Sequence, residues 1–86
     1  MPEVSRFYGI VIKMFFDDHD PPHFHAQYSG HEALIDIRTL GVISGGLPAR
    51  ALGLVAEWTS LHQDEILSLW EKAKTLEPLH KIDPLP

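Results

Sequence analysis

Apolar residues alternate with polar ones in the first half of the chain and take a helical spacing in the second half. Between residues 7 and 16 every second side chain is apolar: Tyr8, Ile10, Ile12, Met14 and Phe16. Because successive side chains of a strand point to opposite faces, this alternation predicts a strand with one buried face. The acidic residues and two prolines of 17–22 then end the strand, since proline fixes φ and lacks a ladder donor.

The alternation resumes on both sides of Ser29-Gly30, which has the composition of a tight hairpin turn. A two-residue loop there predicts a register with Phe24 opposite Ile35 on the apolar face. The same register places His23 opposite Asp36 on the polar face. A slip of one residue would mix the two faces, so the pattern favours this pairing.

The hairpin that precedes this one along the chain has a longer loop. Matching apolar faces predicts Phe16 opposite Phe24, which leaves Phe15 beside His25 and Lys13 beside Gln27. A short fourth strand is expected at Val42-Ile43-Ser44.

Apolar residues from Ala51 to Leu61 and from Ile66 to Ala73 form two helical stripes after Pro48, which suits the first turn of a helix. Two helices with a break near Ser60 are expected, and one long bent helix from Pro48 to Thr75 is the alternative. Trp58 and Trp70 lie in these stripes and are predicted to be in the core.

These elements predict an α+β fold in a single domain, residues 1–86. An antiparallel three- or four-stranded meander occupies about 7–44, and two C-terminal helices at about 48–75 pack on its apolar face. An extended tail covers 77–86. The open polar face would display Lys13, His23, His25, Gln27, Glu32, Asp36 and Arg38.

Charge and composition narrow the classes of function. The net charge is −5 with only 7 basic residues, which argues against a chain-wide electrostatic grip on nucleic acid. Cysteine is absent, so disulfides and thiolate zinc sites are excluded. We find no apolar run long enough to span a bilayer and no signal peptide, so a cytoplasmic location and no membrane partner are expected.

The richest chemistry lies in the segment Asp17–His25, with three histidines and three acidic residues. His23 and His25, two apart on a strand, point the same way and can reach one metal ion. His19 across the proline loop, or Asp36 across the ladder, would supply a further ligand. The sequence does not identify a cofactor; if the segment binds a metal, these ligand types suit a divalent ion such as zinc.

Two other interpretations of the segment stay open. In a metal-free enzyme, His23 oriented by Asp36 would be the general base and His25 the acid, a catalytic pair suited to RNA cleavage. In a binding module, the histidine-bearing face or an open sheet edge would meet another protein or a second copy of the chain. The residues alone do not decide whether the chain is an enzyme.

The segments Pro2–Ile10, Asp18–Ala26 and Leu47–Leu52, with Glu57-Trp58 and Leu61-His62, resemble a bacterial family, domain of unknown function 4160. The resemblance runs from Pro2 to about Pro84. It implies a small prokaryotic protein, often encoded beside another small protein, an arrangement that suggests a toxin–antitoxin-like pair. We therefore expect an interaction module whose partner is encoded nearby, with metal binding or ribonuclease activity as the alternatives.

Overall fold

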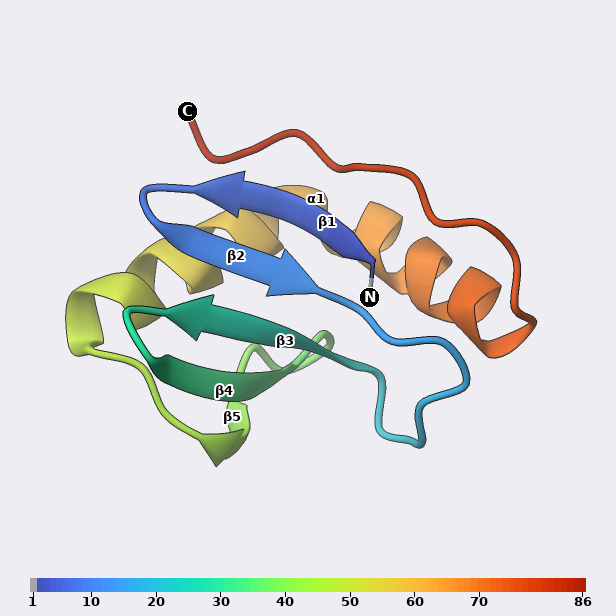
Figure 1. The fold of residues 1–86 in the computed structure, drawn as a ribbon, viewed down its shortest axis with the longest axis horizontal. Coiled ribbons are helices and arrows are strands. Elements are labelled where there is room, and N and C mark those ends of the chain that lie inside the picture. Colours follow the sequence, from blue (N-terminus) through green and yellow to red (C-terminus); the bar gives the residue numbers. More distant parts are fainter. Residues whose placement is uncertain (1) are drawn as a thin grey trace.

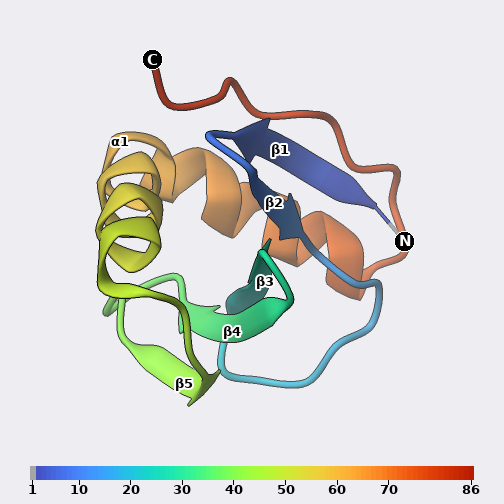
Figure 2. The same ribbon diagram turned by 60° about the vertical axis from the view of Figure 1, so that its left-hand side comes forward.

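Five strands follow one another as an antiparallel meander, and one long helix covers one face of the sheet (Figures 1 and 2). The computed structural model describes residues 2–86. Its elements are β1 (Glu3–Phe7), β2 (Ile10–Lys13), β3 (His23–Tyr28), β4 (His31–Asp36), β5 (Val42–Gly45) and α1 (Ala49–Lys74). The predicted α+β class and antiparallel meander are confirmed, but the expected count of three or four strands is wrong.

The extra strand arises because the predicted strand from Phe7 to Phe16 is a hairpin. Tyr8 and Gly9 have φ values of 49° and 80°, the left-handed conformation that a two-residue hairpin turn requires at both positions. Tyr8 is 60% exposed and does not join the buried face. A non-glycine residue rarely adopts positive φ, so the alternation of Tyr8 with Ile10 concealed the turn.

The two central pairings differ in how well the sequence predicts them. The register of β3 with β4 is confirmed, with His23 opposite Asp36 and Phe24 opposite Ile35. The register of β2 with β3 is wrong by two residues, because Lys13 pairs with His25. The ladder ends at Lys13, and the chain then turns toward the helix, where the N–H of Asp17 donates to the carbonyl oxygen of Ala73 at 3.0 Å.

The expected pair of C-terminal helices is one helix with a kink, which corresponds to the alternative prediction. His62 has non-helical angles (φ −127°, ψ 20°), and α1 changes direction there (Figure 2). One turn earlier, the hydroxyl of Thr59 donates to the carbonyl oxygen of Val55 at 2.7 Å and that of Ser60 to Glu57 at 2.8 Å. Such bonds to the preceding turn bend helices. Within residues 2–86, no helix has the length and apolar character needed to cross a membrane.

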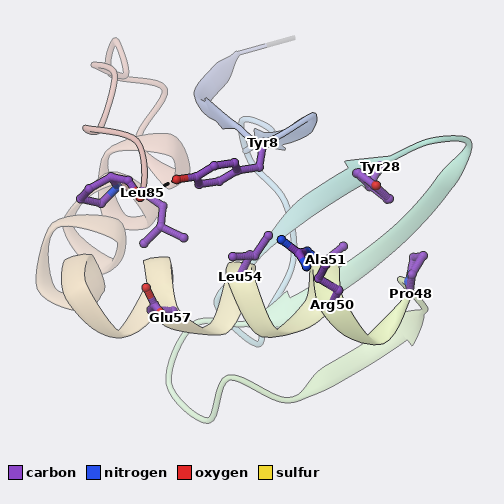
Figure 3. A pocket seen from close by; sticks show the side chains of 9 residues that line it. Tyr8, Tyr28, Pro48, Arg50, Ala51, Leu54, Glu57 and Leu85 are labelled. Carbon is purple, nitrogen blue, oxygen red and sulfur yellow. Dashed lines mark hydrogen bonds between the residues drawn. The ribbon is translucent and has the colours of Figure 1, made fainter.

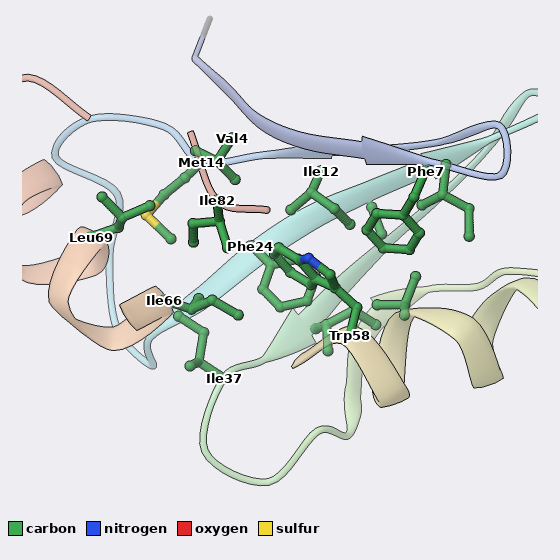
Figure 4. Close-up of a cluster of buried hydrophobic side chains, with 14 of the residues drawn as sticks. Val4, Phe7, Ile12, Met14, Phe24, Ile37, Trp58, Ile66, Leu69 and Ile82 are labelled. Carbon is green, nitrogen blue, oxygen red and sulfur yellow. The ribbon is translucent and has the colours of Figure 1, made fainter. Parts of the chain in front are cut away.

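The core lies between the sheet and α1, with Trp58 at its centre (Figure 4). Its ring centroid lies 5.5 Å from that of Phe7 and 5.8 Å from that of Phe24. Trp58 is fully buried and Trp70 is 1% exposed, so both are core residues as predicted. The indole N–H of Trp58 donates to the carbonyl oxygen of Asp83 at 2.8 Å, which ties the tail to the core.

The tail after α1 runs along β1 without regular secondary structure (Figure 1). The N–H of Ile82 donates to the carbonyl oxygen of Val4 at 2.7 Å. The side chains of Ile82 and Leu85 are buried. The tail therefore adds to the core and covers the β1 edge of the sheet.

Two glycines should respond to alanine in opposite ways. Gly45 has φ +74°, and a Cβ there would collide with the carbonyl oxygen of Glu32. We expect Gly45→Ala to lower the free energy of unfolding by at least about 2 kcal/mol. Gly53 is exposed on α1 with nothing near its Cβ position, so Gly53→Ala should raise that free energy by about 0.8 kcal/mol. Urea unfolding measures both, and equal effects would contradict the strand geometry at Gly45.

Candidate metal centre

Three side chains converge where the loop between β2 and β3 meets the start of β3. Oδ2 of Asp18 lies 3.0 Å from Nε2 of His23 and 3.4 Å from Nε2 of His25. One ligand atom from each residue lies within 4.8 Å of the others, so the three could hold one metal ion. In the part of the chain that the structure describes, no other group of three such residues is as close.

The strand and the loop bring these residues together for simple reasons. His23 and His25 are two positions apart on β3, so their side chains leave the same face. The loop then folds back over that face, and the Phe15 ring packs edge-on against His25 with centroids 4.3 Å apart. The Trp70 ring of α1 lies 5.3 Å from that of His23. These two rings cover the histidines, and the His23 side chain is only 5% exposed. The prediction that His23 lies on an open face is therefore wrong.

The orientation of the His23 ring is fixed by a backbone carbonyl. Nδ1 of His23 lies 2.8 Å from the carbonyl oxygen of Pro21. A carbonyl oxygen only accepts, so Nδ1 carries a proton and donates it. Nε2 is therefore the atom that faces Asp18. This is the arrangement in which proteins commonly present a histidine to a metal, with the other ring nitrogen bonded to a carbonyl or carboxylate.

The other side of His25 faces a second carboxylate. Its Nδ1 lies 3.4 Å from Oε2 of Glu32 but has no hydrogen-bond partner among residues 2–86, although it is buried. Gln27 donates to the same oxygen of Glu32 at 3.1 Å and holds that side chain near the ring. A small movement of Glu32 would complete a carboxylate–histidine pair of the kind found behind metal ligands.

The charge of Asp18 is set by opposing effects. Burial acts to raise the pKa of its carboxyl group. The hydrogen bonds from the backbone N–H of His19 and the ring of His25, with the charges of His23 and His25, outweigh burial, so the pKa of Asp18 lies below its ordinary value. Asp18 is therefore an anion at neutral pH and suited to bind a cation.

The remaining predicted ligands lie around this cluster in different roles. His19 points into solvent with a side chain 95% exposed, and its Nδ1 lies 3.5 Å from Oδ1 of Asp18. Asp36 is opposite His23 in the ladder, but its Oδ1 accepts from the N–H groups of Arg38 at 2.8 Å and Thr39 at 3.0 Å. Asp36 thus stabilises the turn after β4, and the carboxylate that reaches the histidines is Asp18.

Sequence reasoning did not single out Asp18 as a ligand. The only signal was its position in the segment rich in histidine and aspartate, seven residues before His25. A strand register predicts partners across a ladder, whereas Asp18 reaches the histidines from a loop whose path depends on tertiary packing.

A cavity of about 460 Å³ lies between the hairpin ends and the first part of α1 (Figure 3). Arg50 extends toward its middle in the view of Figure 3, with Tyr8 and Tyr28 on the sheet side. Its lining is formed by Tyr8, Tyr28, Pro48, Arg50, Ala51, Leu54, Glu57, Leu85 and Pro86. The cavity shares no residue with the histidine–aspartate cluster, so the two features are separate.

Comparison with known proteins places the cluster inside a recognised family domain. Residues 9–71 match the family model described as Domain of unknown function (DUF4160). The chain belongs to this family. The resemblance seen in the sequence is confirmed, and the DUF4160 match includes all three converging residues as well as His19 and Asp36. No curated protein and no solved structure matches the chain.

The pKa of Asp18 predicts how acid affects the metal-free protein. Because this pKa is lower in the folded state, ionised Asp18 stabilises the fold above its unfolded pKa of about 4. That stabilisation is lost as pH falls through the lower folded pKa. Asp18→Asn should therefore be less stable than wild type at neutral pH, and the difference should shrink below about pH 4. Urea unfolding in the presence of a chelator measures it, and a difference independent of pH would contradict the charge interaction.

Proposed function

We propose that this DUF4160 domain binds a divalent transition-metal ion through Asp18, His23 and His25. The support is the match between the cluster and metal geometry. Ligand atoms at about 2.0 to 2.1 Å from a metal are about 3.3 Å apart in a tetrahedron and about 2.9 Å apart in an octahedron. The Asp18 oxygen lies 3.0 and 3.4 Å from the two Nε2 atoms, close to these values, and all three ligand atoms lie within 4.8 Å of one another.

The ligand types indicate which ions are suitable. Two imidazoles with one carboxylate suit zinc, iron, nickel and copper, whereas calcium and magnesium prefer sites made wholly of oxygen. Zinc is the first choice, because tetrahedral sites with two histidines and one carboxylate are common for it. The same three ligand types with open positions also bind non-haem iron.

We include His19 as the fourth ligand. Its side chain is 95% exposed, and its Nδ1 lies 3.5 Å from Oδ1 of Asp18. A fourth protein ligand would close the site, as in structural zinc centres. The low exposure of Asp18, His23 and His25 supports this closed form over one that admits a substrate. The metal would then clamp the loop between β2 and β3 onto the sheet.

The other functions expected from the sequence have less support. Acid–base catalysis by His23 and His25 requires a substrate to reach them, and the His23 ring is 5% exposed beneath Trp70. A neighbouring partner protein and a toxin–antitoxin-like pair rest on the family resemblance and stay predictions, as does the cytoplasmic location. The metal site is therefore the proposal that the geometry carries furthest.

Isothermal titration with zinc tests the proposal. We expect one ion per chain, with affinity at least about 100-fold weaker in His23→Ala and in His25→Ala, because each variant loses a direct ligand. His19→Ala should weaken zinc binding by about tenfold. His31→Ala should not weaken it, since His31 is exposed at the end of β4 away from the cluster. Circular dichroism confirms that each variant is folded.

Equal zinc affinity in the wild-type protein and in His25→Ala would rule out this site. His25 is the preferred variant because His23 is buried in contact with Trp70, so its removal also changes packing. If His19→Ala binds as tightly as wild type, three protein ligands hold the ion and the closed form is wrong.

A further inference from the structure

The cavity at the start of α1 has the size and the lining of a small-molecule site. Its volume of about 460 Å³ lies within the range of about 300 to 1,000 Å³ that is usual for ligand sites. The hairpin ends supply Tyr8 and Tyr28, α1 supplies Arg50 and Leu54, and the tail supplies Leu85 (Figure 3). Such sites are mostly apolar, with a few polar groups that orient the ligand. In this lining the basic group is Arg50.

Contacts within the fold hold the two tyrosines of the lining in place. The hydroxyl of Tyr8 donates to the carbonyl oxygen of Pro86 at 2.7 Å, which ties the ring to the tail. The Tyr28 ring lies against Gly9, since a Cβ on Gly9 would be 3.4 Å from its Cε1 atom. Tyr8 also has a φ of 49°, a conformation that is rare for residues other than glycine and that clusters at ligand sites. The cavity therefore has two aromatic walls in defined positions.

The fold does not account for the position of Arg50. This exposed cation lies in the first turn of α1, where the helix dipole disfavours positive charge. Within residues 2–86, the lysine and arginine side chains that pair with carboxylates are Arg6, Lys74 and Lys81. Arg50 is not paired there, even with Glu57 of the same cavity, and it extends toward the middle of the cavity (Figure 3). A guanidinium binds a carboxylate through two parallel hydrogen bonds, so a ligand with a carboxylate suits this position.

We propose that this cavity binds a small organic acid with one carboxylate and an aromatic body. The carboxylate pairs with Arg50, and the ring packs against Tyr8 and Tyr28, because aromatic rings form favourable edge-on and offset contacts with one another. Glu57 lies two turns after Arg50 on the same side of α1, and its negative charge disfavours a second acidic group on the ligand. The site shares no residue with the metal centre and is independent of the proposed function.

A titration followed by ¹H–¹⁵N correlation spectra tests the site. Metal-free protein, dialysed to remove the chelator, is titrated with 3-phenylpropionate to about 10 mM. We expect shifts of the backbone amides of Arg50, Ala51 and Leu54 with a dissociation constant below about 1 mM, as is usual for a ligand of this size. The probes 3-phenyl-1-propanol and 3-phenylpropylamine have the same ring but no carboxylate. Each should bind at least about tenfold more weakly, because hydrogen bonds between charged groups are the stronger ones.

Two substitutions with the same change of charge test the carboxylate contact. Arg50→Gln should weaken the binding of 3-phenylpropionate at least about tenfold, since it removes the guanidinium. Arg38→Gln is the matched control, because Arg38 is exposed after β4 and outside the cavity lining. It should change the dissociation constant less than about twofold, since salt screens distant exposed charges.

Three results would overturn the proposal of an acid site. The first is the absence of shifts at the cavity up to the highest concentration, or shifts confined to Asp18, His23 and His25. The second is equally tight binding of the alcohol or the amine, which would mean that the cavity does not recognise a carboxylate. The third is an equal loss of affinity in Arg38→Gln and Arg50→Gln.

Discussion

The loop between β2 and β3 meets the sheet at the contact between Asp18 and His23. Nε2 of His23 faces the carboxylate of Asp18 at 3.0 Å, while Nδ1 of the same ring donates to Pro21. A neutral ring with this tautomer would bring two lone pairs together, which is repulsive. A hydrogen atom or a metal ion between Nε2 and the carboxylate would remove this repulsion. A second contact holds the same loop, since the N–H of Asp17 donates to the carbonyl oxygen of Ala73 in α1.

The role of the cluster depends on whether a proton or a metal ion lies between His23 and Asp18. A proton gives a buried ion pair that links the loop to β3 and loosens when Asp18 is neutralised. The proposed metal ion would also bind His25, because His25 Nε2 is 3.4 Å from the same oxygen. It would be consistent with the acceptors near the other nitrogen of each ring, Pro21 at His23 and Glu32 at His25.

Local patterns predicted much of this fold, and the errors have both local and tertiary causes. The β3–β4 register followed from two alternating strands and a glycine turn, which leave only one pairing that keeps the faces separate. The Tyr8-Gly9 turn was missed because its first residue is not one that usually adopts positive φ. The break expected near Ser60 is present as a kink at His62 within one helix, one turn after hydroxyl groups that bond to the preceding turn. His23 and His25 were identified from spacing, but Asp18 required the folded loop.

The most direct test of the metal centre is long-range ¹H–¹⁵N correlation spectroscopy of the six histidine rings, recorded without and with one equivalent of zinc. It reports which ring nitrogens carry protons and which bind metal. If the cluster is a metal centre, Nδ1 of His23 is protonated in both samples, and zinc shifts Nε2 of His23 and His25 while His31 and His80 do not change. Unchanged resonances of His23 and His25, or a His23 ring without a proton on Nδ1, would contradict it.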